Sequence, residues 1–176
     1  MKKILETSRL LLREMSEEDL SSLKQIIPNG NDEYALKWLH WCLDSYKKYQ
    51  FGHWAVVYKE TGEMIGSIGI SMQYIDDEWK PEIGYHLRKD FQRKGLGKEA
   101  AEAVRDYFFE NFKSDEIYSY MDIDNIASYK TAESIGMNFL HIYKNCRIYK
   151  ITRDEWKAMK NTAQPCLFYF TFLNFF

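Results

Sequence analysis

The chain has 176 residues, a formal net charge of −2 at pH 7 and a hydrophobic content of 45%. This length and content suit one domain with a single core, and the charge gives no basic face of the kind that nucleic acid binds. The three cysteines and four histidines are scattered along the sequence, so we predict neither a disulfide framework nor a metal site.

No targeting or membrane segment is visible. Two lysines follow Met1 without the apolar stretch of a signal peptide, and no apolar run approaches the ~20 residues that span a bilayer. We therefore expect a cytoplasmic protein with no membrane partner.

Hydrophobic periodicity and turn residues divide the first half of the chain. They predict a strand, a helix capped by Ser16, an aromatic helix, a β-hairpin and a further strand, at residues 9–15, 16–23, 34–49, 52–74 and 79–87.

The second half alternates helices and strands. It predicts an amphipathic helix, a strand, a helix ended by Gly136 and a closing hairpin, at residues 98–112, 116–122, 125–135 and 138–151, followed by a short helical turn at 153–159. Hairpins followed by a βαβα unit indicate an α+β (mixed α/β) fold and not a doubly wound parallel sheet.

We assign residues 1–160 to one domain and residues 161–176 to a C-terminal extension. The extension is almost wholly aromatic and apolar. It could add a core strand, form a surface that a second subunit covers, or be a terminal segment without a role. Exposed, it would favour aggregation.

The most informative segment is Gln92-Arg93-Lys94-Gly95-Leu96-Gly97-Lys98, between a predicted strand and a predicted helix. Backbone N–H groups at a helix start have no intrahelical partner, and the helix dipole is positive there. Glycines allow close approach of a ligand, and the three cations add charge. Together these features predict a phosphate site.

Three glycine patterns compete for this segment. A P-loop would need a glycine at Gln92 and a hydroxyl at Glu99, so it fails twice. A dinucleotide fingerprint is formally satisfied by Gly95, Gly97 and Ala100, but residues 88–94 separate the first glycine from the strand. The third pattern, [QR]-x-x-G-x-[GA], is matched by Gln92, Gly95 and Gly97.

This third pattern resembles the pyrophosphate loop of the GNAT superfamily of N-acetyltransferases. The strand Glu82-Ile-Gly-Tyr-His-Leu87 and the segment from Asp124 to Met137 are similar to the family's cofactor strand and its following helix. The segments 7–13 and 16–19 resemble the opening of the ribosomal-protein N-terminal acetyltransferase (Rim-type) branch. The resemblance covers about residues 6–156.

The resemblance implies a GNAT-like fold, with a central, mostly antiparallel twisted sheet, a splayed parallel strand pair and flanking helices. It implies acetyl-CoA as cosubstrate, with no metal. The residues that it places at the cofactor are Tyr85, His86, Leu87, Gln92, Arg93, Lys94, Gly95, Leu96, Gly97, Lys98, Asn125 and Ser128. Among these, the backbone N–H of Leu87 would polarise the thioester carbonyl.

Two residues are predicted to be catalytic. Glu82 could take the proton of the acceptor ammonium if burial raised its pKa, and Ser128 could protonate the leaving thiolate. The tyrosine that many family members use for the second step would fall at Ala132, so a water could serve instead. Helix capping alone would also explain Asn125, and a solvent-exposed strand end would explain Glu82. We expect only one of Tyr85 and His86 to face the cleft, because neighbouring strand residues alternate.

The resemblance implies a primary amine as the acceptor, either a protein N-terminus or a small molecule. Trp38, Trp41, Tyr46 and Trp54 could line its cleft or could simply be core, and the acidic residues 76–78 could attract it or form a solvated turn. Two other functions stay open: a non-catalytic acyl-CoA-binding or partner-binding module, and a NAD-type dinucleotide enzyme. The sequence also leaves a homodimer open.

Overall fold

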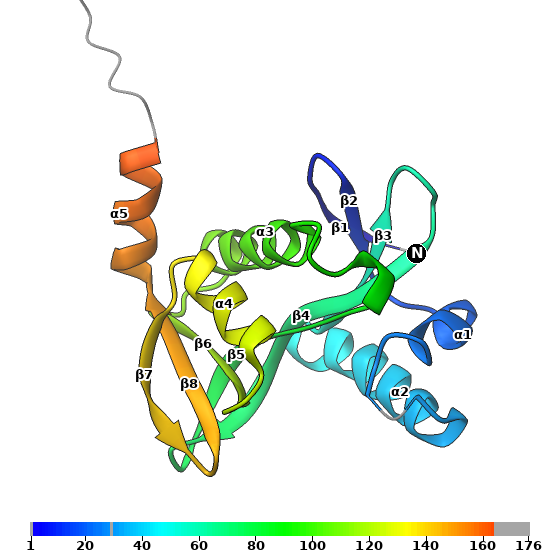
Figure 1. Cartoon of the computed structure of the whole chain (residues 1–176), viewed down its shortest axis with the longest axis horizontal. Helices are drawn as coiled ribbons and strands as arrows, with labels where there is room; N and C mark the ends of the chain where they lie inside the picture. The colour runs from blue at the N-terminus through cyan, green and yellow to red at the C-terminus, as the bar shows by residue number, and fades with distance from the viewer. Residues whose placement is uncertain (1, 29, 164–176) are drawn as a thin grey trace, which may run out of the picture.

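The computed structural model describes residues 2–28 and 30–163, which form an eight-stranded mixed sheet in the order β1-β2-β3-β4-β5-β6-β8-β7 (Figure 1). The strands are β1 (Lys3–Glu6), β2 (Leu10–Arg13), β3 (His53–Tyr58), β4 (Met64–Ile75), β5 (Glu78–Leu87), β6 (Glu116–Asp122), β7 (Asn138–Tyr143) and β8 (Cys146–Thr152). The extension that the sequence assigns to residues 161–176 lies, from residue 164 onward, outside the described residues.

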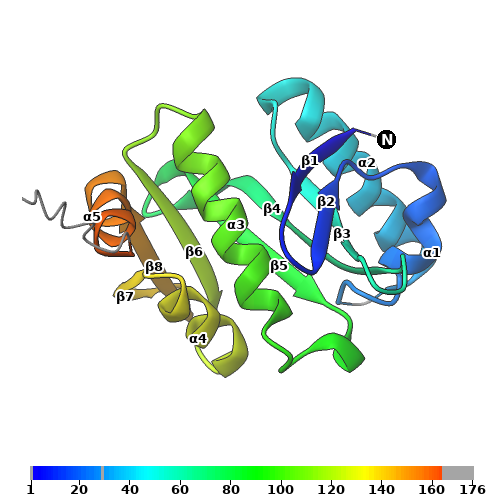
Figure 2. The same cartoon turned by 90° about the horizontal axis from the view of Figure 1, so that it is seen from above.

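Helices cover both faces of the sheet (Figures 1 and 2). The short helices η1 (Glu17–Asp19) and α1 (Leu20–Leu23) and the long α2 (Asp32–Tyr49) lie on one face. The other face carries η2 (Lys89–Phe91), α3 (Leu96–Asn111) and α4 (Ile126–Ser134), and α5 (Arg153–Ala163) follows β8. None of the helices in the described part of the chain combines the length and apolar character that crossing a membrane requires.

Each face has its own hydrophobic core. On the α3 face, Ala101, Val104 and Phe108 pack against Ile68 and other residues of the central strands. On the α2 face, Leu39 is fully buried in a smaller cluster with residues of α1 and β3. The sheet is therefore the middle of three layers.

The parallel pair β5–β6 divides the sheet. Only Glu82 and Tyr118 are paired between these two strands in the described residues, and the Ser119 hydroxyl donates to the Ile83 carbonyl at 3.0 Å. Every other strand pair is antiparallel. The predicted fold class, a mostly antiparallel sheet with one splayed parallel pair, is thus confirmed.

The helix α4 ends as its sequence predicts. Gly136 has φ +84, its N–H donates to Glu133 O at 3.0 Å, and the Met137 N–H donates to Ala132 O at 3.1 Å. These two bonds form a Schellman motif, which needs a residue that tolerates positive φ.

Two elements differ from the prediction. The strand β1 precedes the predicted first strand, and α5 is a full helix of 11 residues instead of a short turn. Packing stabilises α5, since Trp156 stacks on Phe109 at 5.3 Å and donates to Asp106 at 2.8 Å. Neither partner lies near Trp156 in the sequence, so local pattern did not reveal the contact.

Candidate active site

The predicted phosphate loop connects β5 and η2 to α3. Gly95 is the N-cap of α3 with φ +78, a value that glycine adopts with little strain. The first bond of the helix runs from the Glu99 N–H to Gly95 O at 3.1 Å. The N–H groups before Glu99 therefore have no intrahelical acceptor, as at any helix start.

The surroundings of this helix start suit an anion. Arg93, Lys94 and Lys98 are exposed at the loop. A Cβ added to Gly97 would lie 3.1 Å from Leu87 Cδ1, so the helix approaches the end of β5 as closely as a glycine allows. The loop thus meets the steric and electrostatic requirements of a pyrophosphate site.

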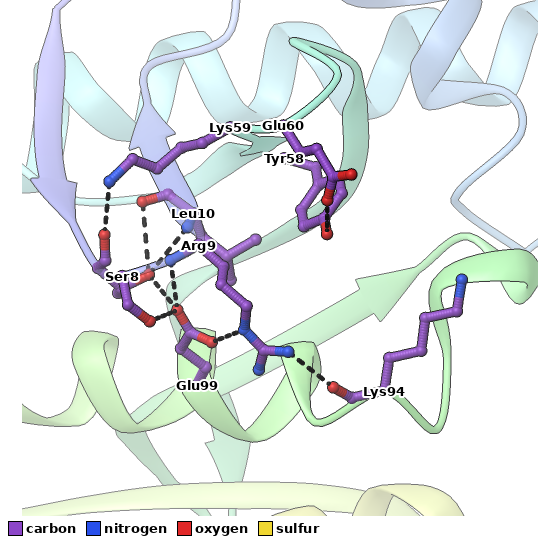
Figure 3. Close-up of polar contacts among 9 residues, drawn as sticks. Ser8, Arg9, Leu10, Tyr58, Lys59, Glu60, Lys94 and Glu99 are labelled. Atoms are coloured by element: carbon purple, nitrogen blue, oxygen red, sulfur yellow. Dashed lines mark hydrogen bonds and ion pairs between the residues drawn. The ribbon is translucent and has the colours of Figure 1, made fainter.

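The N-terminal hairpin, formed by β1, β2 and the residues 7–9 between them, holds the first turn of α3 in place (Figure 3). One oxygen of Glu99 accepts from the Thr7 hydroxyl at 2.6 Å, the Ser8 hydroxyl at 3.0 Å and the Arg9 N–H at 2.9 Å. The other accepts from Arg9 Nε at 2.6 Å, and the same guanidinium donates to Lys94 O at 3.0 Å. Burial raises the pKa of Glu99, but these hydrogen bonds outweigh it and bring the pKa to about 2.

A backbone N–H at the end of β5 points into the gap that opens where β5 and β6 diverge, which we call the split. The Arg88 N–H donates to Ile65 O on β4 at 2.9 Å, and because strand residues alternate in direction, the Leu87 N–H points to the opposite side, where β6 has diverged. The Gln92 side chain donates to Leu87 O at 2.8 Å. This bond ties the loop entry to the strand end.

A cavity of about 830 Å³ occupies the split between β5 and β6. It passes from the α2 face to the α4 face, and both Tyr85 and His86 line it. The expectation that only one of them faces the cleft is therefore wrong. Their side chains do alternate, with Tyr85 donating to Ser128 O and His86 packing on Trp38 at 5.2 Å, but the open split exposes both faces of the strand to one cavity.

Glu82 lies in the wall of this cavity, at the one position where β5 and β6 are paired in the described residues. Its side chain accepts from the Ser71 hydroxyl at 2.9 Å. Burial raises its pKa to about 8, and hydrogen bonds from Ser71 and from the Tyr120 backbone only partly oppose this. The carboxyl group can thus exchange a proton near neutral pH.

The start of α4 forms the other side of the cavity, which Asn125 and Ser128 line. The Asn125 side chain caps the helix by accepting from the Ser128 N–H at 3.2 Å. Ala132 is fully buried in the core, whereas Tyr129 packs under the Arg147 guanidinium at 4.9 Å. Capping therefore occurs, and it leaves Asn125 beside the cavity.

The aromatic residues of the predicted acceptor cleft separate into two pairs. Trp38 and Trp41 line the cavity, whereas Trp54 is a core residue with 1% exposure and the Tyr46 hydroxyl bonds to the backbone of His53. Of the acidic segment 76–78, Asp76 and Asp77 form the turn between β4 and β5 and Glu78 begins β5. None of the three lines the cavity, and Asp76 is 2.9 Å from His141 Nε2.

The sequence prediction missed His53, which is buried in the cavity wall. His53 pairs with Gly69 across β3–β4, and Gly69 pairs with Gly84 across β4–β5. A Cβ on Gly84 would lie 2.9 Å from His53 Nε2. The signal that could have found it is this pair of glycines inside apolar strands, where a bulky group approaches the backbone.

Residues 9–138 match the family described as "Acetyltransferase (GNAT) domain". The chain belongs to the GNAT acetyltransferase family. It is 31% identical over 144 residues to the Bacillus subtilis protein YkkB, a match that covers 76% of this chain and 84% of YkkB.

Solved GNAT structures share the fold. An acetyltransferase from Agrobacterium tumefaciens is 26% identical, with a TM-score of 0.73 over 86% of this chain and 94% of its own. RimL, described as a ribosomal L7/L12 alpha-N-protein acetyltransferase in complex with coenzyme A, is 17% identical, with a TM-score of 0.70 over 88% of this chain and 99% of its own. The structural neighbours of this GNAT chain thus include the ribosomal-protein branch that its opening residues resemble.

Proposed function

We propose that this GNAT protein transfers an acetyl group from acetyl-CoA to a primary amine, either a protein N-terminus or a small amine. Family membership supports acyl transfer to an amine. The observation that carries the proposal is the buried carboxyl of Glu82, with a pKa of about 8, in the wall of the cavity between β5 and β6.

Glu82 is the general base in this mechanism. It takes a proton from the acceptor ammonium, directly or through one water, and frees the nitrogen lone pair. The amine nitrogen then bonds to the thioester carbonyl carbon while the carbon–sulfur bond breaks. A group with a pKa near the working pH is suited to this transfer, because its basic form is both populated and strong enough.

Two further groups, one at the end of β5 and one on α4, complete the chemistry. The Leu87 N–H, directed into the split, donates to the carbonyl oxygen as that oxygen gains negative charge. Ser128 lies beside the cavity with its N–H held by Asn125, and its hydroxyl, or a water next to it, supplies a proton to the departing sulfur. The nitrogen loses its second proton as the amide forms, and this proton replaces the one that the Ser128 hydroxyl or the water gave to the sulfur. The proton that Glu82 gained returns to solvent.

The helix start at Gly95 holds the pyrophosphate of the cosubstrate. Free N–H groups, a positive helix end and the three cations of the loop support this assignment. A dinucleotide site would instead be expected in a doubly wound parallel sheet, but the described strands contain a single parallel pairing.

Thermal unfolding with acetyl-CoA, and separately with NAD(P), tests the cosubstrate. At ~100 times its dissociation constant, a ligand adds about 2.7 kcal/mol and should raise the midpoint by roughly 5–10 °C. We expect a shift with acetyl-CoA alone. A shift with NAD(P) alone would favour the dinucleotide enzyme.

Release of free CoA thiol across a panel of amines then tests transfer. We expect release that depends on the acceptor, with acetylated amine appearing in equal amount. Tight acetyl-CoA binding without release for any amine would instead indicate a non-catalytic acyl-CoA-binding module.

A further inference from the structure

The cavity wall on the α2 side includes a cluster of four aromatic rings, packed edge to face or tilted. Trp38 contacts Trp41, His53 and His86, with ring centroids 5.5, 5.5 and 5.2 Å apart, and Trp41 contacts His53 at 5.5 Å. The rings come from α2, β3 and β5, so this wall is assembled by the tertiary fold. All four line the cavity.

The two imidazoles in this wall are uncharged at neutral pH. Burial lowers the pKa of His53 to about 3, with a smaller contribution from the neighbouring His86, and burial also lowers the pKa of His86. The Trp38 indole N–H is buried without an acceptor in the described part of the chain. The wall therefore presents ring surfaces to the cavity and no fixed positive charge that would repel an ammonium group.

Acidic groups are few around this wall. Glu82 is the carboxyl that lies beside it, since the Glu82 Oε2 and His53 Nε2 atoms approach the same point next to Gly84, at 3.1 and 2.9 Å. Asp122, the other acidic lining residue, is on β6 at the far side of the split. Lys37 also lines the cavity, but its side chain is 72% exposed and paired with Glu33 at 2.7 Å.

This distribution of charged and aromatic groups favours amines with a single ammonium group over amines with several. A polyamine or an aminoglycoside carries several ammonium groups, each of which needs a carboxylate or a well-solvated position. The wall offers one carboxyl and four rings. Aromatic faces attract a single ammonium group and bury the apolar body next to it.

We infer that Trp38, Trp41, His53 and His86 form the acceptor subsite, and that it takes a primary amine carried on a compact apolar or aromatic body without a second charge. The inference rests on the proposed acetyl transfer. Two sources share this chemistry: a free arylalkylamine, and the N-terminal residue of a polypeptide with an apolar side chain.

The test compares kcat/KM for CoA thiol release with five acceptors: phenethylamine, a hexapeptide beginning with Phe, the same hexapeptide beginning with Asp, spermidine and kanamycin. We expect phenethylamine or the Phe peptide to exceed spermidine and kanamycin at least tenfold, and the Phe peptide to exceed the Asp peptide. The faster of the first two identifies the source. Equal or faster turnover of spermidine or kanamycin would overturn the inference while leaving acetyl transfer intact.

Two matched variants test the wall itself. Trp41 and Leu36 both lie on α2 and are equally exposed, at 38% each, but Leu36 does not line the cavity. We expect Trp41→Ala to raise KM for the preferred acceptor at least tenfold with little change in kcat or in acetyl-CoA affinity, and Leu36→Ala to leave all three unchanged. An unchanged KM in Trp41→Ala would overturn the subsite, and no turnover with any amine despite acetyl-CoA binding would overturn the proposed function with it.

Discussion

Glu82 and His53 meet across the α-carbon of Gly84. A Cβ placed there would lie 3.1 Å from Glu82 Oε2 and 2.9 Å from His53 Nε2, so the two polar atoms are at most 6.0 Å apart (3.1 plus 2.9). Two buried titratable side chains thus share the space that the missing side chain leaves. A single water could bridge a separation of this size.

Gly84→Ala should therefore displace one or both of these side chains. We expect turnover to fall about 100-fold, as for other small misplacements at reacting groups, with a loss of about 1–3 kcal/mol in unfolding free energy from overpacking. Steady-state kinetics and urea unfolding measure the two effects. Acetyl-CoA affinity should stay within error, since the loop at Gly95 is not touched, and full turnover in the alanine variant would contradict the assigned role of Glu82.

Glu82→Gln should remove the base while keeping a side chain that Ser71 can still donate to. We expect kcat to fall about 10²–10⁴-fold. In the unmodified protein, kcat/KM, which reports groups of the free enzyme, should rise with pH up to the pKa of about 8 and then level, and this rise should be absent from the variant. Glu78→Gln is the control, because Glu78 is on the same strand with a side chain 75% exposed.

The Glu82 carboxyl should also affect how the unfolding free energy depends on pH. Its folded pKa of about 8 is above the usual 4.5, so the folded state keeps a proton that the unfolded state has lost between these pH values. The unfolding free energy should therefore fall as pH rises from 4.5 to 8. Urea titrations of Glu82→Gln should show a weaker fall; an identical pH dependence would mean that Glu82 is not protonated in this range.

Gly95→Ala tests the cosubstrate loop, with Gly62→Ala as its matched control. Both glycines have positive φ, +78 and +74, and Gly62 lies in a turn where a Cβ would meet nothing within 4 Å. The two variants should lose similar stability, about 1–2 kcal/mol from left-handed strain. Only Gly95→Ala should weaken acetyl-CoA binding, by about tenfold or more in calorimetry, a loss of about 1.4 kcal/mol. If both variants bind acetyl-CoA equally well, the loop is not part of the acetyl-CoA site.

Glu99→Ala tests the connection between the N-terminal hairpin and α3. The carboxylate accepts four hydrogen bonds from Thr7, Ser8 and Arg9, and we expect a loss of about 2–3 kcal/mol in unfolding free energy. Its stabilising effect should persist above the usual pKa of 4.5 and disappear as pH falls toward about 2. Glu110→Ala, on the same helix with a side chain 57% exposed, should change stability by less than about 0.5 kcal/mol.

Ser128→Ala should lower turnover more than it alters acetyl-CoA affinity, because the side chain is assigned to the departing sulfur. Its backbone N–H still donates to Asn125, so the helix cap survives. Ser134→Ala, near the end of the same helix with its hydroxyl bonded to Thr131 O at 2.8 Å, is the control. Unchanged turnover in Ser128→Ala would leave water as the proton source.

Local patterns predicted most of the fold. The strand at residues 116–122 and the Schellman end at Gly136 agree with the structure to the residue, because periodicity and glycine chemistry are local properties. The strand β1 was missed because its four residues, Lys3–Glu6, have too little pattern to distinguish a short edge strand from an irregular terminus.

The candidate site was predictable only where a motif carries it. The glycine loop was predicted from its own residues and from the family resemblance, and Glu82 from the resemblance, whereas His53 has no motif and reaches the cavity through pairing across β3, β4 and β5. Likewise, Glu99 stands out in the sequence only as the residue that rules out a P-loop, and its partners are 90 or more residues away in the sequence. Contacts set by strand register and long-range packing leave no local trace in one sequence.

The hydrogen bonds from residues 7–9 to the Glu99 carboxylate also have a consequence for biosynthesis. The donors at residues 7–9 leave the ribosome before the acceptor, which follows 90 residues later, a delay of about 5–20 s at ordinary elongation rates. Until then the hairpin has no helix to hold, and the first turn of α3 does not exist. The start of α3 is therefore fixed by contacts between residues made about 90 positions apart, and a chain released before Glu99 contains residues 92–98 but lacks the carboxylate that anchors the first helical turn to the hairpin.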